Sequence, residues 1–311
     1  MLATRINSKR GFTLMELLVA MAITTIIVTV LISVTSIALD TWNRSRSELR
    51  ASRQAKQMID TMARDFEGLV IRRNTPHEWL TANNTSNSTT GIGNQLKSTN
   101  ASKLIFFTAA TDRYNGEIGK AGDLGGEVSC VAYNLDYKDP MGPTASNFKT
   151  FVLNRLLVNP NGTLNDLLGK TDLKTAFSTH DSKLSDQENF LCENVFQFSV
   201  TFHVQVTKSA GTTVTVPIAL GRDKGARTAT YFKVNGTEII CDAENGASGG
   251  TTVTAAEIKA GRVAAVELSL TILTDFAIDQ LKSRSFNDTQ KADFLAKHSY
   301  QYIKLVQVPG T

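Results

Sequence analysis

One carboxylate stands alone in the most apolar part of the chain. Glu16 is the single charged residue in the range 12–39, a run of 28 residues without proline or glycine. About 20 apolar residues suffice for a helix to cross a bilayer, so this run predicts a membrane-spanning helix. An ionised carboxylate at the centre of such a helix costs about 2.5–3.5 kcal/mol and usually marks a functional position. The carboxylate of Glu16 therefore has to meet a positive charge or a hydrogen-bond donor.

The residues before this run are basic and end in glycine. Three basic residues lie in the range 5–10, and Gly11 and Phe12 form the junction with the apolar run. From Gly11 the sequence reads G-F-T-L-M-E-L-L-V-A. This stretch resembles the processing site of the type IV prepilin family, which includes the pseudopilins of type II secretion. The resemblance implies that prepilin peptidase cuts after Gly11, that the amine of Phe12 is methylated, and that Glu16 is required for assembly.

Three other interpretations of the apolar run remain open. A secretory signal peptide has an apolar core of about 7–15 residues and is cut at its far end, where Ser36 and Ala38 would supply the small residues. A plain membrane anchor accounts for the length but gives no reason for Glu16. A helix buried in a soluble core rarely has 28 nearly uncharged residues.

The helical pattern continues beyond the apolar run. Further apolar residues recur mostly three or four positions apart: Leu49, Ala55, Met58, Ile59, Met62, Phe66, Leu69 and Val70. Because the first proline is Pro76 and Gly68 favours fraying, we expect one helix from about 12 to about 71. The predicted organisation is a leader at 1–11, a transmembrane half-helix at 12–39, an amphipathic half-helix at 40–74 and a globular domain at 75–311.

The basic residues around the apolar run bear on its orientation. Three precede it and five follow it closely, at Arg44, Arg46, Arg50, Arg53 and Lys56. The positive-inside tendency alone puts the C-terminal side in the cytoplasm. The resemblance implies the opposite, a single-pass inner-membrane protein whose C-terminal domain lies in the periplasm and joins a pseudopilus filament. Long domains cross membranes largely regardless of charge, so we follow the resemblance.

After the helix the apolar periodicity changes to two. Alternation in 195–206 puts Phe196, Phe198, Val200 and Phe202 on one sheet face, and Gln197, Ser199 and Thr201 on the other. We expect further strands at 103–109, 127–137, 151–158, 214–218, 263–273 and 300–308, and a short helix at 288–297. Asn235-Gly236 predicts a type I′ hairpin turn between strands at 230–234 and 238–241. The polar stretch 81–102 predicts a linker. The fold class is therefore α+β, a long helix followed by an antiparallel sheet domain.

The order of these segments narrows the resemblance. Arg64-Asp65 near the helix end, the 103–109 strand and the Leu191-x-x-x-Val195 entry to the long strand look like a J-type minor pseudopilin of type II secretion. The inserts at 81–102 and 242–258 depart from a compact J-type domain. The implied partners are other pseudopilins in a hetero-oligomeric filament, prepilin peptidase and the inner membrane. The alternatives are a minor pilin of a type IV pilus or DNA-uptake system and, in another class, a membrane-tethered binding or enzymatic domain.

Charge gives no reason to expect a nucleic-acid partner. The formal net charge is +4, and removal of the three basic residues of the leader leaves +1. The basic face of the helix after residue 40 is interpreted as a solvated surface rather than a lipid or DNA contact.

Two patterns are reminiscent of enzymes, but we expect no catalytic site. Gly-Ala-Ser-Gly-Gly at 246–250 satisfies the G-x-S-x-G pattern, which needs a strand before it and a helix after it. Here it lies among small and polar residues that predict a flexible turn. The four histidines are scattered and are expected at the surface: His77, His180, His203 and His298.

Metal and disulfide chemistry also have weak support. Asp123 and Glu127 in the glycine-rich stretch 119–127 supply oxygen ligands for Ca²⁺, but without the spacing of a known calcium loop, so a plain turn is favoured. The three cysteines have no zinc-site spacing: Cys130, Cys192 and Cys241. In an exported domain two of them can pair, or all three can serve as small buried side chains.

Overall fold

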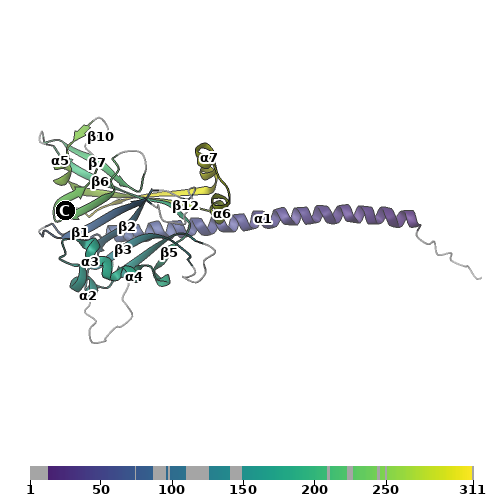
Figure 1. Cartoon of the computed structure of the whole chain (residues 1–311), viewed down its shortest axis with the longest axis horizontal. Helices are drawn as coiled ribbons and strands as arrows, with labels where there is room; N and C mark the ends of the chain where they lie inside the picture. Colours follow the sequence, from purple (N-terminus) through teal and green to yellow (C-terminus); the bar gives the residue numbers. More distant parts are fainter. Residues whose placement is uncertain are drawn as a thin grey trace, which may run out of the picture. The chain divides into compact units, whose positions relative to one another are not determined.

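The structure is a computed structural model of the chain. It describes residues 13–73, 75–86, 96, 99–109, 126–140, 149–208, 211–222, 227–243, 246–248 and 251–309. A long helix is followed by antiparallel sheets that pack against it (Figure 1). The expected α+β class is therefore confirmed. The chain divides into two compact units, residues 1–49 and residues 50–311.

Helix α1 (Leu14–Glu67) starts in the first unit and ends in the second. From residue 50 onward one face of it is buried, through Ala51, Ala55, Met58, Ile59, Met62, Ala63, Asp65 and Phe66. The helix ends four residues earlier than expected. After Glu67 the backbone pairs with the end of strand β2 (Thr99–Thr108), and the Val70 N–H donates to the Phe107 carbonyl at 2.9 Å. That pairing takes backbone groups which a longer helix would have used.

A seven-stranded antiparallel sheet has the strand order β5-β4-β3-β2-β1-β8-β9. Its strands are β1 (Glu78–Ser86), β2 (Thr99–Thr108), β3 (Ser129–Lys138), β4 (Thr150–Val158), β5 (Phe190–Cys192), β8 (Tyr231–Asn235) and β9 (Glu238–Cys241). Short helical segments link β4 to β5: α2 (Pro160–Gly162), η2 (Thr163–Leu167), α3 (Leu173–Phe177), η3 (Ser178–His180), α4 (Asp181–Leu184) and η4 (Gln187–Asn189). The sequence patterns did not predict these segments.

The linker expected at 81–102 is wrong at both of its ends. Residues 81–86 complete β1, and β2 already begins at Thr99. Strand β1 pairs with β2 on one side and with β8 on the other. Because both neighbours supply backbone partners, polar residues of low strand propensity are accommodated there, and Thr81 is fully buried.

The β8–β9 hairpin also differs from its prediction. Asn235 pairs with Glu238, so the two turn residues are Gly236 and Thr237, not Asn235 and Gly236. Among the described turn residues only Gly236 has a positive φ, of 55°. A positive φ at the first central position alone is the requirement of a type II′ turn, for which glycine is preferred.

A four-stranded antiparallel sheet has the order β13-β12-β6-β7. Its strands are β6 (Val195–Thr207), β7 (Thr213–Leu220), β12 (Arg262–Leu273) and β13 (Ser299–Gln307). Helices α6 (Asp275–Ser283) and α7 (Asp288–His298) lie between β12 and β13 in the chain, and α7 matches the expected short helix. The remaining elements are β10 (Gly246–Ser248), β11 (Thr251–Val253) and α5 (Ala255–Lys259).

The alternation expected in β6 is partly correct. Phe198 is 1% exposed, and Val200 and Phe202 are fully buried, as predicted. Phe196 is only half-buried, because the register with β12 shifts there and leaves it as the extra residue of a bulge. Ser199 and Thr201, expected to be exposed, are buried because β6 has a strand on each side.

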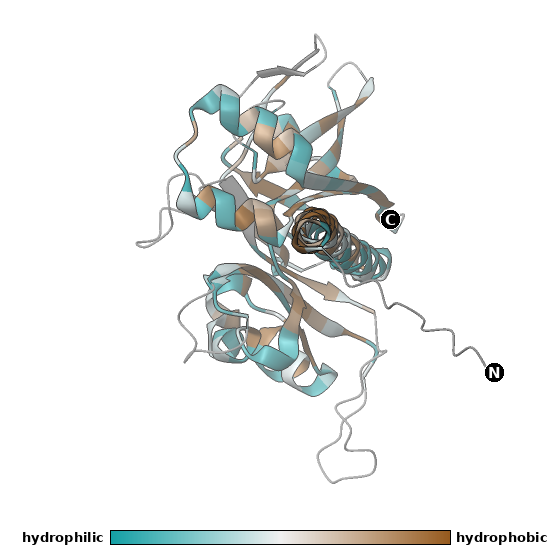
Figure 2. Ribbon diagram, turned by 90° about the vertical axis from the view of Figure 1, so that its right-hand side faces the viewer, coloured by the Kyte–Doolittle hydropathy of each residue, from teal (hydrophilic) through white to brown (hydrophobic). Residues whose placement is uncertain are grey.

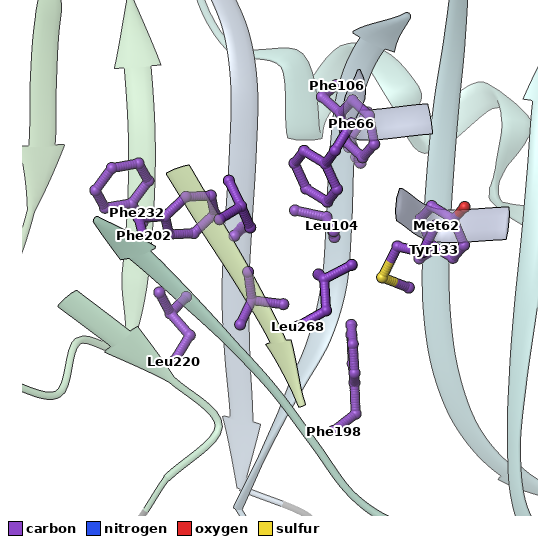
Figure 3. Close-up of a cluster of buried hydrophobic side chains, with 14 of the residues drawn as sticks. Met62, Phe66, Leu104, Phe106, Tyr133, Phe198, Phe202, Leu220, Phe232 and Leu268 are labelled. Atoms are coloured by element: carbon purple, nitrogen blue, oxygen red, sulfur yellow. The ribbon is translucent and has the colours of Figure 1, made fainter. Parts of the chain in front are cut away.

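One hydrophobic core joins the sheets and the second part of α1 (Figure 3). The rings of Phe202 on β6 and Phe232 on β8 stack with centroids 4.1 Å apart, which joins the two sheets. The rings of Phe66 on α1 and Phe106 on β2 stack at 4.3 Å. Residues 50–311 thus form a unit with its own core.

Candidate assembly and anchoring site

The structure describes only one of the three site residues predicted from the sequence, because its description begins at residue 13. Gly11 and Phe12 lie outside the described residues. Glu16 lies in the first turn of α1 and is exposed. The structure therefore provides geometry for Glu16 alone.

Glu16 forms a capping box with Thr13. The backbone N–H and the hydroxyl of Thr13 donate to Glu16 Oε2 at 2.9 and 3.0 Å, and the Glu16 N–H lies 3.3 Å from Thr13 Oγ1. A carboxylate at this position satisfies a free donor of the first turn and interacts favourably with the helix dipole. Glu16 thus has a partner within its own helix, which the sequence reasoning missed. The signal was present as Thr-x-x-Glu immediately before an apolar run.

The apolar side chains that follow Glu16 have no cover within the first unit. Among the described residues, one helix, α1, is long and apolar enough to cross a membrane. No residue in its most apolar stretch is buried. Figure 2 shows these N-terminal turns in brown, the hydrophobic end of the scale. Exposed fractions run from 47% for Val28 to 78% for Leu14 among the large apolar residues in 14–39. A continuous exposed apolar surface of this kind requires lipid or other helices around it.

Most hydroxyl groups of this part of the helix are satisfied within the helix itself. Six side chains donate to the carbonyl four residues earlier at 2.8–3.0 Å, from Thr24, Thr25, Thr29, Ser33, Thr35 and Thr41. In lipid no water is present to accept these hydrogen bonds, so internal pairing suits the helix to a membrane. Trp42 follows with 67% exposure, and tryptophan is enriched at the membrane–water interface.

A buried ion pair fixes the other part of α1 to the larger sheet. Arg155 on β4 donates from Nε and Nη2 to the two carboxylate oxygens of Asp65, at 2.7 and 2.6 Å, and the Tyr133 hydroxyl also donates to Asp65. All three side chains are almost completely buried. Burial and the negative charge of Asp65 raise the pKa of Tyr133 well above its ordinary value. Burial lowers the pKa of Arg155, but its hydrogen bonds to Asp65 and Tyr133 and the charge interactions with both residues together outweigh this, so the pKa lies above the ordinary value. Neither pattern nor spacing indicated this pairing.

The G-x-S-x-G stretch has the wrong backbone for a nucleophile elbow. Gly246–Ser248 forms β10, which pairs with β11, and Ser248 lies opposite Thr251. This is a small hairpin rather than a strand that leads into a helix. The flexible turn expected here is therefore corrected to a two-stranded ribbon, with 249–250 outside the described residues.

The histidines are less exposed than expected. All four are half-buried: His77, His180, His203 and His298. His180 Nε2 lies 3.4 Å from an oxygen of Asp166, and the His298 ring lies 4.5 Å from that of Phe294. They do not converge, and among the described residues no three His, Cys, Asp or Glu side chains are grouped as metal ligands would be.

The calcium and cysteine alternatives have different outcomes. Asp123 lies outside the described residues, and Glu127 is exposed. The cysteines are all free thiols, so the disulfide alternative is not observed. Cys130 and Cys192 are buried, and burial raises the pKa of Cys192 to about 12. Those two thus serve as small buried side chains, and Cys241 is half-buried.

The comparisons with known proteins bear on the N-terminus. A family model described as the prokaryotic N-terminal methylation motif matches residues 6–32, which include Gly11, Phe12 and Glu16. Comparison with curated proteins and with solved structures found no match. The chain is thus type IV pilin-like, with a prepilin-type processing motif in front of a membrane-capable helix and an antiparallel sheet domain.

Proposed function

We propose that this chain is a minor pseudopilin, a structural subunit at the tip of a type II secretion pseudopilus. The observation that carries the proposal is the placement of Glu16 at the start of an apolar helix whose side chains are uncovered, directly after the methylation motif. The precursor would comprise a leader at 1–11, a transmembrane half-helix at 12–39, an amphipathic half-helix at 40–74 and a periplasmic domain at 75–311. Its role is structural and not enzymatic.

Assembly would exchange lipid around α1 for other helices. Close helix packing in membranes depends on small residues at the contact, and α1 supplies Ala20, Ala22, Thr25, Ser33 and Ser36. Glu16 would meet the methylated amine of Phe12 on a neighbouring subunit. This pairing would offset part of the cost of removing the carboxylate from water and would set the axial register between subunits. The capping box offers the carboxylate a local partner before assembly.

Processing is tested by mass spectrometry of the N-terminus of the protein extracted from membranes. The expected mature chain begins at N-methylated Phe12, and Gly11→Val should leave the full precursor in the membrane. A mature N-terminus near residue 39 would instead establish a secretory signal peptide and remove the basis of the proposal.

The J-type assignment rests on the resemblance of the sequence and has a separate test. Co-purification with the minor pseudopilins of a type II system would support it. Co-purification with the minor pilins of a type IV pilus or DNA-uptake system would favour that alternative. A processed protein that stays monomeric in the membrane would favour a tethered binding or enzymatic domain.

A further inference from the structure

A pocket of about 390 Å³ lies between the β8–β9 hairpin and strands β6, β7 and β12. This volume is within the range of about 300–1,000 Å³ that is typical of sites for small ligands. Its lining combines an apolar part with a basic part, and the two parts come from segments far apart in the sequence. Neither the assembly role nor the N-terminal motif makes use of it.

The basic part consists of Arg73 and Arg262, and the described residues that line the pocket include no aspartate or glutamate. The Nε–H of Arg262 donates to Gln205 Oε1 at 2.6 Å, which orients the guanidinium group. Among the described residues no carboxylate forms an ion pair with Arg262. Glu238, which follows the lining residue Thr237, is paired with Lys259 at 3.2 Å. Arg262 therefore carries a positive charge that no described carboxylate neutralises.

The apolar part is built around Trp79, which is 4% exposed. Its indole N–H donates to the Gly236 carbonyl at 2.9 Å, so the ring is held in place with its polar atom satisfied. Ile71, Ile239 and Val263 complete this part.

The backbone around the pocket is closely packed. A Cβ on Gly261 would lie 2.6 Å from a methyl group of Val204, and one on Gly236 would lie 2.5 Å from the Thr75 carbonyl oxygen. Both approaches are closer than side chains tolerate. The packing makes the pocket largely pre-formed, which lowers the entropic cost of binding.

We propose that this pocket binds the C-terminal residue of a peptide, with its carboxylate on Arg262 and its apolar side chain against Trp79. A guanidinium group presents two parallel N–H donors that match a carboxylate, and such charge-assisted pairs are among the stronger hydrogen bonds in proteins. The apolar wall selects a chain that ends in an aliphatic or aromatic residue. The binding site is independent of the proposed filament role, since it lies wholly within residues 50–311.

The test uses the full-length protein in detergent micelles with Trp79 as reporter. The chain has two tryptophans, so Trp42→Phe leaves Trp79 as the single source of indole fluorescence. The probe is an N-acetylated tetrapeptide that ends in Leu with a free carboxylate. The matched probe is the same peptide with a C-terminal amide. We expect a saturable change in Trp79 emission with the acid and binding weaker by about tenfold or more with the amide.

Variants test the contribution of the basic part to binding separately from the folding of the domain. Arg262→Gln should weaken binding of the acid by about tenfold or more and leave binding of the amide unchanged. Thr237→Glu adds a negative charge to the lining and should also weaken binding of the acid. This variant replaces Arg262→Gln in the test if Arg262→Gln fails to fold. Arg284→Gln removes an exposed arginine outside the lining, so it is the matched control and should bind like the parent.

Equal binding of the acid and the amide would overturn the proposal, as would unchanged binding by folded Arg262→Gln and Thr237→Glu. An absence of saturable binding at millimolar peptide would also overturn it. Tighter binding of an amidated peptide with an internal glutamate would assign the site to acidic side chains and overturn the C-terminal specificity.

Discussion

Asp65 of α1 and Arg155 of β4 face each other in the core as a bidentate ion pair, with both side chains at most 4% exposed. Removing two charges from water is expensive, and good geometry with further hydrogen bonds is needed to offset the expense. The Tyr133 hydroxyl supplies one such bond. Only one axial position of α1 brings Asp65 to Arg155. We infer that the pair fixes the axial position of the helix on the sheet.

Loss of one partner of this pair should destabilise the domain strongly. In a soluble fragment of residues 50–311, Arg155→Met should lower the free energy of unfolding by about 3–5 kcal/mol, because Asp65 would remain buried and unpaired. Urea unfolding measures the change. Lys259→Met breaks an exposed pair with Glu238 and should change it by less than about 1 kcal/mol. A loss below about 1 kcal/mol for Arg155→Met would contradict the proposed role.

The bulge in β6 predicts different costs for two neighbouring phenylalanines. Phe198→Ala should lower the free energy of unfolding by about 3–5 kcal/mol, since the ring is buried and leaves a cavity. Phe196→Ala, at the bulge, should cost less than about 2 kcal/mol, because its ring is already partly in water. Similar losses from both substitutions would show that the bulge does not reduce the burial of Phe196.

Glu16 has two candidate roles that substitutions can separate. Glu16→Ala should leave cleavage after Gly11 and folding of the C-terminal domain intact, and weaken co-purification with partner pseudopilins. Thr13→Ala removes the hydroxyl of the cap but keeps the Glu16 carboxylate. This variant should assemble at near wild-type levels if pairing between subunits matters more than the cap. If Thr13→Ala fails in assembly as Glu16→Ala does, the local cap is the important contact. Wild-type assembly of Glu16→Ala would rule out the charge-pairing mechanism.

The stability of the domain should respond to pH through Glu78. Burial raises the pKa of this carboxyl above its ordinary value of 4.5, and Lys233 only partly offsets the effect. The folded state therefore binds the proton more tightly than the unfolded state. The unfolding free energy of the wild type, taken relative to Glu78→Gln, should fall as the pH rises from about 4 through the raised pKa.

Glu257 supplies a control of opposite sign for that experiment. Hydrogen bonds from the backbone and side chain of Thr254 lower its pKa. Relative to Glu257→Gln, the wild type should therefore gain stability as the pH rises from the lowered pKa to the ordinary value of 4.5, which lies below the range in which Glu78 acts. A flat profile against Glu78→Gln, with the expected slope against Glu257→Gln, would show that Glu78 is not effectively buried in solution.

The sequence was informative wherever one side of an element faces water. Strand β6 was predictable because its apolar residues alternate, and the course of α1 because its apolar spacing is regular. Strand β1 was missed because its polar residues, such as Thr81 and Asn83, lie between two paired strands and have no alternating pattern. Burial there follows from the neighbours, which the local sequence does not contain.

The candidate site was predictable only in part, for similar reasons. The position of Glu16 could be read directly, and its cap was readable as Thr-x-x-Glu but was overlooked. The Asp65–Arg155 pair joins residues 90 positions apart. The pocket around Trp79 likewise combines residues from separate parts of the chain. Spacing in one sequence cannot reveal contacts that depend on how distant strands are brought together.

Strand β13 contacts the C-terminal part of α1, although the two elements lie far apart in the sequence. Tyr302 on β13 donates to Ser52 of α1, and Lys304 donates to Asp60, across separations of 250 and 244 residues. Contacts this distant in sequence form slowly, because a long loop must close before they contribute. The four-stranded sheet also lacks one of its edge strands until residues 299–307 are present. The domain therefore completes its fold only after residues 299–307 have left the ribosome, and a nascent chain shortened before β13 leaves one side of α1 bare.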